Sequence, residues 1–239
     1  MMIAALLLLF VIIAGPTMTL VSDFFANLGA YAREVVPLSM PFGREDDGFR
    51  QGWTAFYWAW WISWSPFVGM FIARVSRGRT VREFVICVLI VPSIVSVLWM
   101  TAFGGTAIEQ VLTDSGSQVR EYVIASYSPE LSLFGMLADL PFASITSFIA
   151  IILVIVFFVT SSDSGSLVID TITAGGKVDA PVSQRVFWCT FEGLVAIALL
   201  LGGGLGALQA MAVSTGFPFT IVLLLACYAI FKGLKDEPR

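Results

Sequence analysis

Two stretches of the sequence hold residue types that could do chemistry within an otherwise apolar chain. FYWAWWISWSPFVG, residues 56–69, contains four tryptophans, one tyrosine and two phenylalanines. FVTSSDSGS, residues 158–166, contains five hydroxyl side chains and one carboxylate. The faces of indole rings attract cations that cannot donate hydrogen bonds, such as quaternary ammonium groups. Hydroxyl and carbonyl oxygens suit a hard cation such as sodium.

The aromatic residues of the first stretch have helical spacing. One helix face would carry Trp53, Tyr57, Trp60, Trp61 and Trp64, with Phe56 at its border and Trp58 to one side. Tryptophans that anchor a span lie at the headgroup level, which suits Trp53 but not the deeper members of the set. Two interpretations stay open for the deeper rings, namely a packing ridge against neighbouring helices and a cage for a cation.

Pro66 favours the cage, because it predicts a break in the same helix. Proline removes a backbone donor and clashes with the preceding turn, and Ser63, Ser65 and Gly69 surround it. Broken helices at membrane depth are tolerated where they line a cavity or are buried in protein. Transporters build their midplane substrate sites from such helices.

In the second stretch, the hydroxyls of Thr160 and Ser161 and the carbonyl of Phe157 could supply three oxygen ligands. The alternative is that the hydroxyls bond to their own helix. Asp163 is costly within a span and serves either as a structural partner or as part of an ion pathway. Asp170 is expected to be an ordinary helix-end charge near the Lys177 loop, and Glu192 has no evident partner.

The elements that must position these residues are membrane-spanning helices. The 239 residues are 58% hydrophobic and 13% charged, with a mean hydropathy of +0.90, whereas soluble domains average about 25% charged residues. Apolar runs of about 20 residues recur, without the alternation of a barrel. We therefore expect an all-α integral membrane protein with about six spans, near residues 1–21, 53–74, 83–104, 142–171, 184–203 and 207–232.

Basic residues set the expected orientation. Arg74, Arg77, Arg79 and Arg82 follow the second span, and Lys232, Lys235 and Arg239 follow the last. Because such residues stay cytoplasmic, the first span runs outward and the C-terminus is cytoplasmic.

The segments between the spans also have predicted structures. SDFFANLGAYAREVV predicts an outer-surface amphipathic helix over residues 22–37, with Ser22 as its N-cap. Residues 105–140 predict an outer loop with short helices, and the glycine-rich segment 201–208 predicts a turn.

The sequence holds no histidine, and its three cysteines lie in separate apolar runs. Zinc and haem ligation are therefore not expected. We expect no cofactor and no metal beyond a sodium ion, membrane lipid as the surroundings, and no nucleic-acid partner.

Three segments resemble the betaine/carnitine/choline transporter (BCCT) family. They are GWTAFYWAWWISWSPFVGMFIARVSRGRTVREF (52–84), FFVTSSDSGSLVIDTIT (157–173) and GPTMTLV (15–21). The resemblance implies a partial LeuT-like fold of inverted five-helix repeats, with six of twelve spans present and the N-terminal half of the transporter missing. It also implies a location in the cytoplasmic (inner) membrane and leaves room for a homotrimer.

The resemblance also implies the site. Its substrate-binding positions fall on Phe56, Trp58, Trp60, Trp61 and Trp64. Among these, Trp60 and Trp61 are expected as the main cage faces, and Trp64 and Phe56 as access-path residues. Phe157, Thr160 and Ser161 match the family's second sodium site.

The expected function is ion-coupled secondary active transport of a small quaternary-ammonium compatible solute of the glycine betaine, choline or carnitine type. A membrane-embedded enzyme would need paired aspartates, a serine dyad or a metal cluster. A channel would usually show a filter or a ring of charge. The sequence favours neither alternative, and we expect no enzymatic activity.

Overall fold

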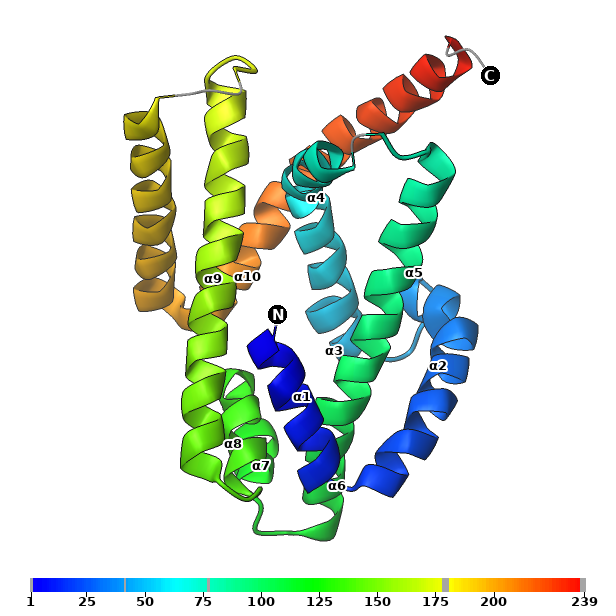
Figure 1. Ribbon diagram of the computed structural model, residues 1–239, viewed down its shortest axis with the longest axis vertical. Helices are drawn as coiled ribbons and strands as arrows, with labels where there is room; N and C mark the ends of the chain where they lie inside the picture. The colour runs from blue at the N-terminus through cyan, green and yellow to red at the C-terminus, as the bar shows by residue number, and fades with distance from the viewer. Residues whose placement is uncertain (1, 41, 77, 178–180, 237–239) are drawn as a thin grey trace. The chain divides into compact units, whose positions relative to one another are not determined.

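The structure is a computed structural model that describes residues 2–40, 42–76, 78–177 and 181–236 (Figure 1). All regular elements within these ranges are helices. The chain forms two compact units, unit 1 from residues 1–35 and 78–159 and unit 2 from residues 36–77 and 160–239. Met1, Arg77 and Arg239, which entered the predicted spans and charge pattern, lie outside the described residues, as does the side chain of Arg74.

Unit 1 begins with a bent pair of helices. α1 (Met2–Ala14) and α2 (Thr17–Ser39) meet at an angle of 114°. Pro16 stands at the bend and cannot continue the backbone ladder of α1. The hydroxyl of Thr17 instead donates to the carbonyl of Ile12 at 2.7 Å. Residue 21, the predicted end of the first span, therefore lies inside α2, and Ser22 does not cap a helix, since it also lies inside α2 and donates to the carbonyl of Thr19.

The next helix has a clear N-terminal signal. Thr80 accepts a hydrogen bond from the backbone nitrogen of Glu83 at 3.3 Å and so caps α5 (Val81–Trp99). A π-helical turn, Met100–Gly104, joins α5 to α6 (Gly105–Thr113). The helical run thus continues beyond the predicted end of the span at residue 104.

Short helices follow, as predicted for residues 105–140. They are α7 (Gln118–Arg120), a π-helical turn (Glu121–Ala125), a 3-10 turn (Pro129–Leu131) and α8 (Ser132–Ala138). The first half of α9 (Ala143–Thr173) completes unit 1.

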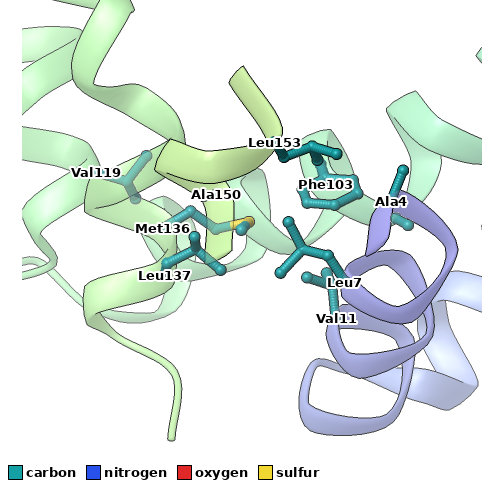
Figure 2. Close-up of a cluster of buried hydrophobic side chains, with 10 residues drawn as sticks. Ala4, Leu7, Val11, Phe103, Val119, Met136, Leu137, Ala150 and Leu153 are labelled. Atoms are coloured by element: carbon teal, nitrogen blue, oxygen red, sulfur yellow. The ribbon is translucent and has the colours of Figure 1, made fainter. Parts of the chain in front are cut away.

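One hydrophobic cluster forms the core of unit 1 (Figure 2). Ala4, Leu7 and Val11 lie on one face of α1, and the cluster also contains Ala102, Phe103, Val119, Met136, Leu137, Ala150 and Leu153. Val11 and Leu137 are fully buried. In a membrane protein such helices are held by close van der Waals packing, so the close contacts within this cluster hold α1 against α8 and α9.

Unit 2 contains the aromatic helix. It comprises the end of α2, α3 (Asp47–Phe49), a π-helical turn (Arg50–Ala55), α4 (Phe56–Val75), the second half of α9 and α10 (Val182–Asp236). α10 changes direction where Gly203 and Gly204 leave the helical conformation (Figure 1). Gly204 has φ 62° and ψ −148°, a combination essentially restricted to glycine. The predicted glycine-rich turn is therefore a two-residue kink between two helical segments.

Three helical segments of the described chain are long and apolar enough to cross a membrane, namely Val81–Thr113, Ala143–Thr173 and Val182–Lys235. The bent pair α1–α2 makes a fourth candidate. The last segment has 54 residues, which exceeds twice the ~20 residues that one span needs. The number of six spans stays a prediction.

Close backbone contact joins α4 to the second segment of α10. A Cβ atom on Gly216 would stand 2.6 Å from the carbonyl oxygen of Ala59 and 3.0 Å from its Cα atom. The contacted atoms belong to backbone and cannot move aside as a side chain can. Gly216 is therefore required for this approach.

We expect Gly216→Ala to destabilise the protein by about 1–3 kcal/mol, the usual cost of overpacking. Thermal unfolding in detergent measures the loss. Gly206→Ala is the matched control on the same helix, because a Cβ there meets nothing within 4 Å. Equal melting temperatures for the two variants would contradict the α4–α10 contact.

Candidate functional site

α4 is continuous through Pro66, so the predicted helix break is wrong. Pro66 cannot donate to the carbonyl of Ile62, its acceptor in a regular helix. The hydroxyl of Ser65 donates to that carbonyl instead, at 2.7 Å. One serine thus replaces the lost backbone bond, which is a known means of accommodating proline in membrane helices.

The aromatic side chains of α4 and its leading turn stack along the helix. The ring centroids lie 6.1 Å apart for Trp53 and Tyr57, 5.6 Å for Tyr57 and Trp60, and 5.9 Å for Phe56 and Trp60. Such spacings are those of favourable aromatic pairs. Trp61 is 61% exposed and Trp60 44% exposed, so both present indole surface that the rest of this chain does not cover.

Trp64 lies deeper in α4 and lines a cavity shared with α9. The cavity has a volume of about 240 Å³. It is lined by Trp64, Phe67, Val68 and Phe71 of α4 and by Thr160, Ser161 and Ser164 of α9. An aromatic wall therefore faces a row of hydroxyl groups inside unit 2.

The structure brings only some of the predicted site residues together. Trp64, Thr160 and Ser161 share the cavity just described. Trp58 instead lines a larger pocket, of about 540 Å³, against the second segment of α10. The other predicted residues lie outside both cavities. The rings of Phe56 and Trp60 stack on each other, and the ring of Trp61 is exposed. Phe157, one turn before Thr160 on α9, and Asp163 both have exposed side chains. The roles assigned to all these residues stay predictions.

Sequence reasoning missed a ladder of polar contacts between α9 and the first segment of α10. From the middle of α9 towards its end, the contacts are Ser162–Glu192 at 3.2 Å, Ser166–Cys189 at 3.0 Å, Asp170–Arg185 at 3.6 Å, Thr173–Trp188 at 3.1 Å and Thr173–Gln184 at 2.7 Å. The signal was present in the spacing, because residues 162, 166 and 170 and residues 185, 189 and 192 each recur at three or four positions.

Asp170 differs most from its prediction. Its side chain is 1% exposed and faces the guanidinium of Arg185, with the Nε atom 3.6 Å from Oδ2. The prediction of an ordinary charge near the Lys177 loop is therefore wrong. The buried carboxylate of Asp170 and the Arg185 side chain, which is 37% exposed, form an ion pair that ties α9 to α10.

These features define a class of protein. The described chain is all-helical, has apolar segments of membrane-crossing length, and sets an aromatic helix against hydroxyl groups across a cavity. Such a chain is a multi-pass integral membrane protein. Its whole length, residues 1–239, matches the family described as betaine/carnitine/choline family transporter, and the chain belongs to that family.

The curated relatives are similar along the whole chain. A glycine betaine/proline/choline transporter of Vibrio parahaemolyticus is 69% identical over 239 residues, which are 100% of this chain and 42% of that protein. Glycine betaine transporter 1 of the same organism is 57% identical, over 99% of this chain and 45% of its own length. A glycine betaine transporter of Acinetobacter baylyi is 42% identical, over 99% and 36%.

The chain spans about two fifths of the length of these relatives. The family is one of transporters, in agreement with the expectation that the chain is not an enzyme. Family membership and the all-helical structure also agree with the expected partial LeuT-like fold.

The Asp170–Arg185 ion pair generates a prediction. Arg185→Met leaves the buried carboxylate of Asp170 without its cation, and because Arg185 is 37% exposed the expected cost is about 1–3 kcal/mol, below that of a fully buried pair. We expect a lower thermal unfolding midpoint in detergent for Arg185→Met. The double variant, Arg185→Met with Asp170→Asn, is expected to recover most of the lost stability. Lys232→Met is the control, since Lys232 is exposed on the same helix. An unfolding midpoint as high in Arg185→Met as in this control would contradict the pairing.

Proposed function

We propose that the chain is part of a secondary active transporter that carries a small quaternary-ammonium compatible solute, of the glycine betaine, choline or carnitine type, coupled to an ion gradient. Membership of the betaine/carnitine/choline family supports the substrate class. The main structural support for the proposed site is the cavity that Trp64, Thr160 and Ser161 line together. The same cavity is therefore lined by an indole ring, which suits an organic cation, and by hydroxyl oxygens, which suit a metal cation.

In this proposal the aromatic residues have different roles. Trp60 and Trp61 supply the main faces of the cage, while Trp64 and Phe56 line the access path, with Trp58 at the side. The exposure of Trp60 and Trp61 supports a role in which further helices complete the cage. Those helices belong to the N-terminal half implied by the family resemblance.

The ion-binding part of the proposal rests on α9. Phe157, Thr160 and Ser161 occupy consecutive turns of that helix, and both hydroxyls line the cavity. Among the residues that the structure describes, the Ser161 hydroxyl makes no hydrogen bond and is free to accept a ligand. A sodium ion suits these neutral oxygens. Asp163, exposed on the same helix, is either a structural partner or part of the ion pathway.

The proposed setting is the inner membrane, with the C-terminus in the cytoplasm. The basic residues of the described C-terminal segment, Lys232 and Lys235, support this orientation. A homotrimer is the oligomer implied by the family resemblance and stays a prediction. A membrane-embedded enzyme or a channel has no comparable support.

In the full-length transporter, Trp61→Leu is expected to weaken trimethylammonium binding roughly 30-fold, which corresponds to loss of a desolvated cation–π interaction of about 2 kcal/mol. Trp53→Leu is the control. It lies at the start of the aromatic segment, where water and headgroups can replace its ring, so we expect less than about threefold. Uptake and equilibrium binding of radiolabelled glycine betaine and choline in proteoliposomes provide the measurements.

Wild-type affinity in Trp61→Leu would remove the cage assignment and leave the transport proposal standing. A wild-type protein without substrate-stimulated, gradient-dependent uptake would overturn the transport proposal itself.

Thr160→Ala combined with Ser161→Ala is expected to raise the sodium concentration for half-maximal uptake roughly tenfold or more, because two oxygen ligands are removed. Ser164→Ala is the control within the same cavity. Its hydroxyl donates to the carbonyl of Thr160 at 2.8 Å and is satisfied by its own helix. Sodium dependence that does not change in the double variant would show that these hydroxyls are structural.

A further inference from the structure

Glu192 is a carboxylate within a membrane-spanning segment and has no assigned role. It is the eleventh residue of α10, which places it about 15 Å along the helix axis from the first residue. Among the residues that the structure describes, no basic side chain pairs with it. A carboxylate at such a depth is costly and is functional by default.

Within the described part of the chain, one side chain bonds to Glu192, and it comes from α9, the helix that carries the proposed sodium ligands. Ser162 of α9 donates to the Oε2 atom of Glu192 at 3.2 Å. Other serines of this stretch bond within α9, since Ser164 donates to the carbonyl of Thr160 and Ser166 to the carbonyl of Asp163. Ser162 is therefore the serine whose hydroxyl reaches a carboxylate on another helix.

The Ser162–Glu192 contact lies at the helical turn that carries the proposed sodium ligands. Ser162 directly follows Thr160 and Ser161, and it forms the innermost contact of the α9–α10 ladder. A helix anchored at this turn cannot rotate or slide without breaking the bond. The orientation of the two ligand hydroxyls is thus tied to the position of Glu192.

Helices α4, α9 and α10 come close to one another at Gly165, next to this contact. A Cβ atom on residue 165 would stand 3.7 Å from Cη2 of Trp64 and 3.8 Å from Oε1 of Glu192. Trp64, the aromatic residue of the cavity wall, is therefore a near neighbour of the same turn of α9. The carboxylate is thus near the Trp64 indole, which lines the same cavity as Thr160 and Ser161.

We infer that Ser162 and Glu192 are positioning residues for the sodium site, with Glu192 accepting the hydrogen bond that fixes the turn of α9 bearing Thr160 and Ser161. The inference rests on the proposed sodium-coupled transport. It goes beyond that function by adding α10 to the machinery that sets cation affinity. Metal ligands generally need partners that fix their orientation, and loss of such a partner lowers metal affinity.

The test uses the full-length transporter in proteoliposomes and measures the half-saturating sodium concentration together with the substrate KM at saturating sodium. Ser162→Ala and Glu192→Ala are each expected to raise the half-saturating sodium concentration roughly three- to tenfold, the effect of losing one hydrogen bond. The substrate KM at saturating sodium stays at the wild-type value. The double variant is no worse than either single variant, because both remove the same bond.

Two further variants separate positioning from other effects. Glu192→Gln keeps an oxygen that accepts from Ser162, so its sodium dependence stays close to that of the wild type. Cys189→Ala removes the next contact of the ladder, with Ser166, and is expected to leave sodium dependence unchanged even where it lowers stability. An effect of Glu192→Gln as large as that of Glu192→Ala would assign the role to charge and overturn the inference.

The remaining outcomes are equally decisive. If Cys189→Ala raised the half-saturating sodium concentration as much as Glu192→Ala, the effect would come from general packing of α9 against α10, and the inference would be overturned. Sodium-dependent uptake that is unchanged in Glu192→Ala would overturn this inference alone. Wild-type uptake that does not depend on sodium would overturn both the proposed sodium coupling and this inference.

Discussion

A polar group surrounded by hydrocarbon must find its partner within the protein, and this constraint determines most of unit 2. Water cannot satisfy a freed carbonyl or an isolated carboxylate at that depth. The carbonyl opposite Pro66 is therefore bonded by Ser65, and α4 stays straight enough to present its aromatic residues in a row. The same constraint pairs Asp170 with Arg185 and Glu192 with Ser162 across two helices.

The polar pairing of α9 with α10 fixes which face of α9 is left for other uses. Ser162, Ser166 and Asp170 are one turn apart and all turn towards α10. Thr160, Ser161 and Ser164 consequently line the cavity to which Trp64 of α4 also contributes. In a helix of ordinary composition, hydrophobic packing would set this rotation. Here the hydrogen bonds specify it, because an apolar interface in lipid offers little driving force between helices.

The features that sequence could predict are those that depend on local spacing. Helices, the stacked row from Trp53 to Trp60 and the short helices after residue 105 all follow from periodicity, and the family resemblance follows from rare residues in series. The features it could not predict depend on a partner elsewhere. Whether Pro66 breaks a helix depends on the rotamer of Ser65, and whether Asp170 is a surface charge depends on which residue of α10 faces it. The bend at Pro16 was readable from the sequence, because proline cannot continue the backbone ladder of α1.

The shared cavity gives a physical reason why an ion and an organic cation could be coupled in the proposed function. Coupling between two ligands is a free energy that arises when each prefers the same state of the protein. Trp64, Thr160 and Ser161 line one cavity of about 240 Å³, so in the proposed function a sodium ion that orders the two hydroxyls would also order the indole next to them. A substrate that prefers this arrangement of the access path to the cage then binds more tightly. Because α9 is in turn anchored to α10 by Ser162 and Glu192, a third helix shares in this free energy without contacting either ligand.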